Sequence, residues 1–412
     1  MYYVKKFRIR NKLYCVNLKE MEIFEISDKK EFDDYVDNLK EDDFISRKIT
    51  KELLPKLVLN ISNNCNLNCI YCYANQGNYG RKNRLMNKDT INKIIDDLIN
   101  KGVKNIEIVE LFGGEPLINN NIEYIVSKLN ENFKIKKYII TTNGTQDLSI
   151  IEPIIAKNNV KVAVSLDGPE DIHDELRGEG TFKKAENFIN ELKKINLDNE
   201  ISCTYTLKHD QKGYSLSKIE NYLKGFGLPF HINNVITDDL NLKRELVVTR
   251  TQAIERTKND IKTLKKGEKN YNLDPFLIRV IQAFLLGTVS IKFCDELDTE
   301  FNLAYDYNGD VYSCFKMWGD EDYRLIDNKT NNKKLEVIND KNNINKCKNC
   351  FTKYLCNFCV KDTILKNESI PYKQDICPVR RRYEDAIELF LEEIDKGEIE
   401  ILINNVKDKI LW

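Results

Sequence analysis

The sequence predicts an α/β protein whose centre is a partial, open-sided (β/α)6 barrel. From Lys56 to about Asn234, short β-branched runs alternate with amphipathic stretches of helical period, which is the pattern of a parallel βα array. Six such units fall short of the eight that close a complete barrel. Four groups of unusual residues also come directly after predicted strands, at the edge where barrel enzymes place their active sites.

The six strands are short and rich in β-branched and aromatic residues. They are predicted at Lys56–Ile61, Ile106–Phe112, Tyr138–Thr142, Lys161–Leu166, Ile201–Leu207 and Phe230–Asn234. Apolar residues at helical spacing predict the intervening helices. These are expected near Lys88–Asn100, Ile122–Asn132, Ser149–Asn158, Phe182–Ile195 and Leu216–Gly225.

Further elements flank this array. Three strands and a helix are predicted before it, at Lys6–Ile9, Lys12–Asn17, Glu22–Ile26 and Lys30–Leu39. After it come a largely helical stretch, a cysteine-rich region from Cys294 to Cys377, and a last amphipathic helix near Pro378–Lys396 with a short tail. We therefore expect five parts, at residues 1–50, 51–240, 241–290, 291–380 and 381–412.

Composition narrows the possible partners and compartment. The 412-residue chain has a formal net charge of −1, so no overall field attracts nucleic acid or an anionic membrane, and neither is an expected partner. The N-terminus lacks the apolar core of a signal peptide, and no apolar run reaches about 18 residues, so a cytoplasmic location is expected. Twelve cysteines in such a chain favour metal ligation over disulfides, while Cys15 and Cys203 are expected in the core.

Cys65, Cys69 and Cys72 follow the first predicted strand with C-x3-C-x2-C spacing. Three thiolates can hold a 4Fe-4S cluster with one iron free of protein ligands, whereas electron-transfer clusters normally have four cysteine ligands. A closed zinc site or buried thiols are the alternatives, but zinc sites usually pair C-x2-C units or include histidine, and no histidine lies near these residues. The spacing therefore favours a catalytic cluster.

With Tyr71 in its aromatic position, this motif resembles the C-x3-C-x-aromatic-C signature of the radical S-adenosylmethionine (SAM) superfamily. The resemblance implies that the amine and carboxylate of SAM chelate the open iron. It also implies that one-electron reduction splits SAM into methionine and a 5'-deoxyadenosyl radical. The cofactor carries the difficult chemistry, and the protein positions it.

The residues after the next strands extend this resemblance. Gly113, Gly114 and Glu115 match the family's GGEP motif, which meets the methionyl ammonium; alone, the run could be a turn before a helix. The run from Ser165 to Arg177 resembles that of protein and peptide maturases, which implies that these two residues contact the methionyl carboxylate. A surface salt bridge is the alternative for Arg177. Further SAM contacts are expected at Tyr71, at Asn143 (otherwise a polar turn residue), and near Asn233 and Val235.

A second group of cysteines occupies the C-terminal region and resembles the SPASM domain of radical SAM maturases. That domain carries two auxiliary 4Fe-4S clusters, so three clusters are expected in all. By the family's interleaved pattern, cluster I takes Cys294, Cys314 and Cys359, and cluster II takes Cys347, Cys350, Cys356 and Cys377. The family's C-x2-C-x5-C-x3-C knot is one residue shorter here, before Cys359. A zinc site at Cys347, Cys350, Cys356 and Cys359 is the alternative.

SPASM enzymes act mainly on peptides and proteins, which suggests a maturase of a ribosomally made precursor peptide. A cluster I with three protein thiolates could bind a substrate cysteine, so a thioether crosslink is the favoured product. The rival sulfatase maturase, which makes formylglycine, uses an aspartate base where Phe315 follows Cys314 here. Peptide epimerisation and carbon–carbon crosslinking stay open. No base is assigned among His173, His209 and His231.

The N-terminal strands resemble the leader-recognition segment of peptide maturases. An exposed strand edge could capture a leader peptide by strand addition, and a β-cap over the barrel is the alternative. The expected partners are a precursor peptide, with a leader and a cysteine-containing core, and a reductant such as flavodoxin or ferredoxin.

Overall fold

The computed structural model describes residues 3–39, 52–195, 198–235, 239–242, 250–267, 273–287, 289–294, 302–325, 340–357 and 377–410. The chain divides into two compact units. Unit 1 comprises Met1–Lys48, Val247–Asp295 and Lys334–Trp412, and unit 2 comprises Ile49–Leu246 and Glu296–Lys333. No helix among the described residues is long and apolar enough to cross a membrane.

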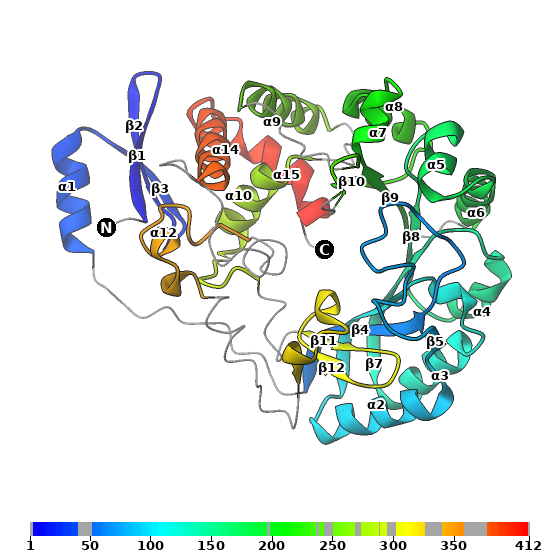
Figure 1. Cartoon of the computed structure of the whole chain (residues 1–412). Helices are drawn as coiled ribbons and strands as arrows, with labels where there is room; N and C mark the ends of the chain where they lie inside the picture. The colour runs from blue at the N-terminus through cyan, green and yellow to red at the C-terminus, as the bar shows by residue number, and fades with distance from the viewer. Residues whose placement is uncertain are drawn as a thin grey trace. The chain divides into compact units, whose positions relative to one another are not determined.

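Unit 2 contains the predicted parallel sheet, and all six predicted strands are confirmed. They are β4 (Leu53–Asn63), β6 (Asn105–Gly113), β7 (Lys134–Thr142), β8 (Val160–Ser165), β9 (Asp198–Tyr205) and β10 (Phe230–Asn234). Each pairs in parallel with the next along the chain, and Figure 1 shows them as a curved sheet. The fold is therefore the open βα barrel that the sequence predicts.

Helices cover the outer face of this sheet (Figure 1). They are α2 (Lys88–Asn100), α3 (Ile122–Asn132), α4 (Glu152–Ile155), α5 (Glu170–Arg177), α6 (Thr181–Lys194), α7 (Leu207–Gln211) and α8 (Leu216–Lys224). In α2 the Asn87 side chain caps the first turn by accepting from the Thr90 backbone N–H at 2.8 Å. Its buried side chains recur at helical spacing, at Ile91, Ile94, Ile95 and Leu98.

Unit 2 differs from the prediction in several details, and helices α5 and α7 were not predicted. The sheet continues beyond β4 through a parallel strand, β11 (Asn302–Tyr305), and the short antiparallel strands β12 (Val311–Tyr312) and β13 (Arg324–Leu325). The helix predicted from Ser149 is shorter, because Pro153 has no N–H to bond to the preceding turn.

The short strand β5 (Arg84–Leu85) pairs with the end of β4. The 3-10 turns of this unit are Pro116–Ile118, Leu148–Ile150, Phe315–Met317 and Glu321–Tyr323.

Unit 1 combines an antiparallel meander with helices. Its strands are β1 (Val4–Ile9), β2 (Lys12–Asn17) and β3 (Glu22–Ile26), followed by α1 (Lys29–Asn38), which confirms the predicted N-terminal elements. The larger helices are α9 (Arg250–Lys265), α10 (Pro275–Leu286), α14 (Pro378–Asp395) and α15 (Ile399–Ile410). The predicted C-terminal tail is wrong in part, since most of it forms α15. Short turns are Lys341–Asn343 and α12 (Asn345–Lys348).

Both faces of the small N-terminal sheet are covered. One face, with Phe7 and Val16, joins a core formed with α9, α10 and α14. The other face holds the fully buried Cys15 and packs against Phe32 and Val36 of α1. The core position expected for Cys15 is confirmed, and so is that of Cys203 in unit 2.

Candidate active site

The parallel register brings the predicted motifs to one edge of the sheet. The cysteine loop begins after Asn63, the last residue of β4. Gly113 ends β6, Thr142 ends β7 and Ser165 ends β8. Because these neighbouring strands run in parallel, their carboxyl ends lie side by side.

The two glycines of the GGEP run press against the start of the cysteine loop. The Gly114 N–H donates to the Ser62 carbonyl at 2.7 Å, and the Glu115 N–H donates to the Asn64 carbonyl at 2.9 Å. A Cβ at Gly113 would lie 2.3 Å from the Ser62 carbonyl oxygen, and one at Gly114 would lie 2.3 Å from that of Asn64. Any side chain here would push the loop away. The two glycines therefore allow the backbone of this run to pack closely against the end of β4 and the start of the cysteine loop.

The three cysteines present partly exposed sulfurs in surroundings that suit a cluster. The Cys65 sulfur accepts from the Leu67 N–H at 3.4 Å and from Asn143 Nδ2 at 3.8 Å, and such bonds to sulfur tune iron–sulfur clusters. Burial raises the pKa of the Cys69 thiol to about 11. Among the described residues, no three Cys, His, Asp or Glu side chains converge as around a single ion. Thiolates of a 4Fe-4S cluster each bind a different iron, so their spacing is wider.

Glu115 supplies a buried carboxylate beside the cysteine loop. Its Oε1 accepts from the Leu117 N–H at 3.0 Å and from the Thr142 hydroxyl at 2.7 Å, and Oε2 accepts from the Asn143 N–H at 2.7 Å. Burial nevertheless raises the pKa of Glu115 to about 7. Within the described part of the chain it forms no ion pair. A carboxylate in this state fits a cationic ligand group, such as the methionyl ammonium of SAM.

Arg177 is buried at the end of α5 and pairs with Asp167. Its Nε donates to Oδ2 at 2.7 Å and its Nη2 to Oδ1 at 3.1 Å. The guanidinium carbon also lies 5.5 Å from the ring centroid of Tyr71, whose hydroxyl donates to Asp167 Oδ2 at 2.5 Å. Burial alone would raise the pKa of Asp167, but Arg177 outweighs it and keeps that pKa below its usual value. SAM contacts were predicted from the sequence at Tyr71 and Arg177, whereas no role was predicted for Asp167.

The remaining predicted SAM residues lie in or directly after β7, β8 and β10. Asn143 is buried, and its Nδ2 also donates to Asn66 Oδ1 at 2.9 Å, so it spans from the end of β7 to the cysteine loop. Ser165 lies beside Ser202 in the sheet register. Asn233 is in β10 and Val235 follows that strand, two strands away from Ser165. All of these residues belong to unit 2.

An aromatic cluster joins the segment after Cys314 to this edge of the sheet. Trp318 packs on Tyr79 with ring centroids 5.6 Å apart. Tyr79 in turn lies 6.2 Å from Tyr73, the residue after Cys72. Phe112 of β6 contacts the same cluster. The aromatic contacts therefore connect the loop that carries Cys72 with the segment that carries Cys314.

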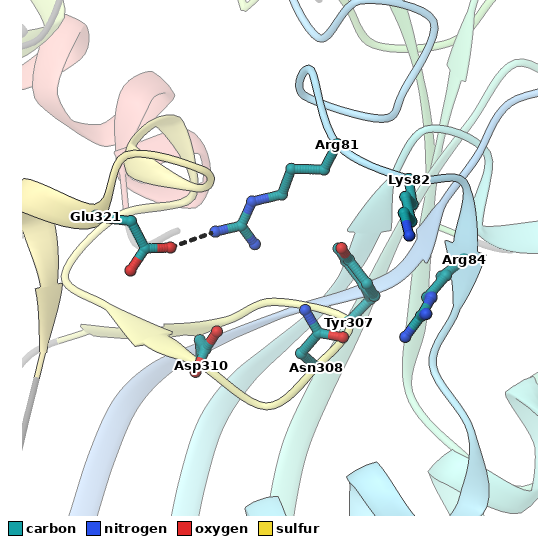
Figure 2. Close-up of a pocket in the computed structure, with 7 residues that line it drawn as sticks. All are labelled: Arg81, Lys82, Arg84, Tyr307, Asn308, Asp310 and Glu321. Carbon is teal, nitrogen blue, oxygen red and sulfur yellow. Dashed lines mark hydrogen bonds and ion pairs between the residues drawn. The ribbon is translucent and has the colours of Figure 1, made fainter.

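A cavity of about 450 Å³ separates the loop after the cysteines from the turn between β11 and β12 (Figure 2). Arg81 reaches across it to Glu321 at 3.1 Å and also bonds the Tyr312 hydroxyl at 3.1 Å. Lys82 and Arg84 line the same cavity. Its described lining includes none of the predicted SAM or cluster residues. Arg81 also pairs with Asp306 Oδ2, in the β11–β12 turn, at 2.5 Å, and so holds that turn against the loop.

The four cysteines expected to hold cluster II lie together in unit 1. Burial and then the charges of Cys350 and Cys377 raise the pKa of Cys347 to about 11. Burial raises the pKa of Cys356 to about 12, and the positive charge of Lys341 opposes that rise. Lys341 is only 1% exposed, so a buried cation lies near Cys347 and Cys356. This charge arrangement fits an anionic cluster.

The residues expected to hold cluster I are divided. Cys294 belongs to unit 1 and Cys314 to unit 2, while Cys359 lies outside the described residues. The zinc alternative also depends on Cys359. Both assignments stay predictions.

Comparison with known proteins identifies the family. A model of the radical SAM superfamily matches residues 59–212. The uncharacterized protein MJ0907 of Methanocaldococcus jannaschii is 31% identical over 268 residues, which are 63% of this chain and 85% of that protein. Residues 59–212 therefore form a radical SAM domain. This radical SAM enzyme is expected to use SAM and a 4Fe-4S cluster, which the residues around Cys65 and Glu115 fit.

Other radical SAM proteins match it over different lengths. The radical SAM cyclopropyl synthase TigE of Paramaledivibacter caminithermalis is 29% identical over 219 residues, 48% of this chain and 46% of TigE. The structure of anSMEcpe with bound AdoMet has a TM-score of 0.62 at 20% identity, covering 86% of this chain and 97% of that one. Streptococcus suis SuiB bound to precursor peptide SuiA has a TM-score of 0.52 at 15% identity, covering 92% and 99%. These two structures share the fold of this enzyme.

Proposed function

We propose that this radical SAM enzyme is a maturase that acts on a ribosomally made precursor peptide and installs an intramolecular crosslink, with a cysteine thioether as the favoured product. The observation that carries the proposal is the single edge of the sheet at which the cysteine loop, Glu115 and Arg177 meet. When bound, the cluster and SAM supply the one-electron chemistry that produces a 5'-deoxyadenosyl radical. Cys65, Cys69 and Cys72 would hold the cluster.

Different residues around the cysteine loop are assigned to different groups of SAM. Glu115 offers a carboxylate to the methionyl amino group; burial raises the pKa of Glu115 to about 7, and a cationic partner would stabilise its charged form. Arg177 and Ser165 are assigned to the methionyl carboxylate. Asn143 holds the loop through Asn66 and Cys65. The peptide would then approach this edge from solvent.

The N-terminal sheet supports a peptide substrate. Within the described residues, β3 pairs only with β2, so its other edge can accept a leader peptide by strand addition. Both faces of this sheet are already packed, which leaves its edges as the surface for a partner. The structure of SuiB contains its precursor peptide SuiA, and that protein shares this fold. A physiological reductant such as flavodoxin or ferredoxin completes the proposal.

SAM cleavage is tested first. Anaerobically reconstituted enzyme, given SAM and dithionite, should form 5'-deoxyadenosine. Cys69→Ala should abolish this product, and Cys15→Ala, which removes a buried thiol of unit 1, should retain it. Absence of 5'-deoxyadenosine from the wild-type enzyme would contradict the proposal.

The product is tested with a small precursor peptide encoded beside the gene. A crosslink removes two hydrogens from the peptide mass, whereas epimerisation leaves the mass unchanged. A thioether also consumes one cysteine thiol, so iodoacetamide labels the product at one site fewer. A carbon–carbon crosslink is the second candidate, favoured by the match to the cyclopropyl synthase TigE, and it would leave every thiol reactive. The formylglycine product would convert a residue without forming a crosslink.

Leader binding needs point variants, because Phe7 and Val16 belong to the core of unit 1 and deletion of the sheet would expose that core. Glu22 and Glu25 are exposed on β3 and three residues apart, so their N–H groups point to opposite edges of the strand. Proline at the outward-facing position should weaken peptide binding and keep the thermal midpoint of the protein. Equal peptide affinity in both proline variants would favour a structural cap.

A further inference from the structure

Asp167 connects three parts of the barrel through its side chain. Besides the two bonds from Arg177 and the one from Tyr71, its Oδ1 accepts from the Thr204 backbone N–H at 2.9 Å. The carboxylate is fully buried. It therefore links the cysteine loop, α5 and β9 in one hydrogen-bonded group.

The backbone of Asp167 is held as well. Its N–H donates to His173 Nδ1 at 3.2 Å. Its carbonyl accepts from His209 Nε2 at 2.7 Å and from the Cys203 thiol at 3.6 Å. Because His209 Nδ1 accepts from the Thr206 N–H at 3.1 Å, the Nε2 atom carries the proton. Two histidines and a cysteine for which no chemical role was predicted thus hold the backbone of one aspartate.

Stability alone does not account for such an arrangement. A buried ion pair loses hydration on both partners, and apolar side chains of similar size often stabilise a protein equally or better. The ion pair fixes the orientation of the Arg177 guanidinium. The bidentate contact occupies Nε and Nη2 of Arg177, and among the described residues Nη1 has no acceptor. Nη1 is therefore held in a fixed orientation from which it can donate to a ligand.

A second contact couples the same helix to the cysteine loop. The Ile70 N–H, between Cys69 and Cys72, donates to the Leu176 carbonyl at 3.0 Å. The end of α5 is therefore attached to the loop once through the backbone and once through Tyr71 and Asp167. A change at Asp167 reaches both the loop and Arg177.

We propose that Asp167 is a positioning residue for SAM: its carboxylate orients the guanidinium of Arg177 and the ring of Tyr71 against the cysteine loop. The inference rests on the proposed function, because it takes Arg177 to be a SAM ligand. Asp167 itself does not touch the cofactor. Replacement of Asp167 should weaken SAM binding, while Cys65, Cys69 and Cys72 should still bind iron.

The test compares Asp167→Asn with Glu200→Gln in reconstituted enzyme. Glu200 pairs with Lys161 at 2.6 Å on the neighbouring strands β8 and β9, away from the carboxyl edge, so it is a control ion pair of the same sheet outside the site. Asp167→Asn should raise the SAM dissociation constant about tenfold, the scale of one lost charged hydrogen bond. It should also lose the change that SAM causes in the EPR spectrum of the reduced cluster. Glu200→Gln should match wild type in both.

The outcomes separate this inference from the proposed function. If wild-type enzyme fails to bind SAM, the proposed function fails. If wild type binds SAM and Asp167→Asn binds it equally, with the same EPR change, the positioning role is wrong. If the Asp167→Asn variant fails to bind iron, the Tyr71→Phe variant provides the test. It removes the hydrogen bond from the Tyr71 hydroxyl to Asp167 and keeps the ion pair between Asp167 and Arg177. That variant should weaken SAM binding a few fold at wild-type iron content, and unchanged binding would overturn the inference.

Discussion

Phe315 packs against Phe112 with ring centroids 5.1 Å apart. Phe112 immediately precedes the GGEP run, and Phe315 immediately follows Cys314, so the contact joins two motifs that lie about two hundred residues apart in sequence. Phe315 also lies 6.0 Å from Trp318. The position that carries a base in sulfatase maturases is therefore part of an aromatic cluster here.

We expect Phe315→Asp to destabilise unit 2 without creating formylglycine activity. A carboxylate among aromatic rings loses part of its hydration, and the ring contacts with Phe112 and Trp318 are lost as well, at about 2–4 kcal/mol in all. Phe315→Leu should lose only about 1 kcal/mol. Thermal unfolding followed by circular dichroism measures both variants. A Phe315→Asp enzyme that unfolds like wild type would show that the cluster does not support this segment.

Glu115 should make the SAM-free enzyme less stable as pH rises. Its folded pKa of about 7 is above the ordinary value of 4.5, so its protonated form is favoured in the fold. The stability that this proton provides is complete below about pH 4.5 and is lost as pH rises through 7. Between pH 6 and pH 8 the loss amounts to about 1 kcal/mol. Glu115→Gln should lack this part of the pH dependence, which thermal unfolding at the two pH values would measure.

Lys341 should stabilise unit 1 through two backbone carbonyls. Its Nζ donates to Ser290 at 2.9 Å and to Lys353 at 2.7 Å. Lys341→Met leaves both carbonyls without this donor and removes a positive charge beside the cluster II cysteines, so the free energy of unfolding should fall by about 2–4 kcal/mol. Lys348→Met, at an exposed lysine of the same segment, is the matched control. Iron content should fall with stability if the four thiols bind a cluster.

The order of strands and the edge that carries the site could be predicted from sequence, because both depend on local periodicity and on the parallel pairing that βα units impose. Cys65, Glu115 and Arg177 were predicted as site residues for the same reason, since each follows a predicted strand within a recognisable motif. Strand β11 was missed because its four residues carry no periodic signal within a cysteine-rich region. It becomes a strand only by pairing with β4.

The role of Asp167 could not be predicted, because its partners are scattered along the chain. Tyr71 lies 96 residues before it and Thr204 lies 37 residues after it. No spacing in the sequence indicates that these residues meet. The same holds for His173 and His209, which were assigned no role from the sequence and which hold the backbone of Asp167.

Gly114 should be required for assembly of the cluster, for a purely steric reason. Its backbone has no left-handed conformation, so an alanine there would be strained only by its contacts. The added Cβ would lie 2.3 Å from the Asn64 carbonyl oxygen, 2.6 Å from the carbonyl carbon and 2.8 Å from Gly77 Cα. Gly114→Ala should therefore displace the start of the cysteine loop and lower the iron bound after reconstitution by more than about half. Gly225→Ala is the control, since its Cβ would come no closer than 3.0 Å to any neighbour. Wild-type iron content in Gly114→Ala would mean that the loop can move without losing the geometry that binds the cluster.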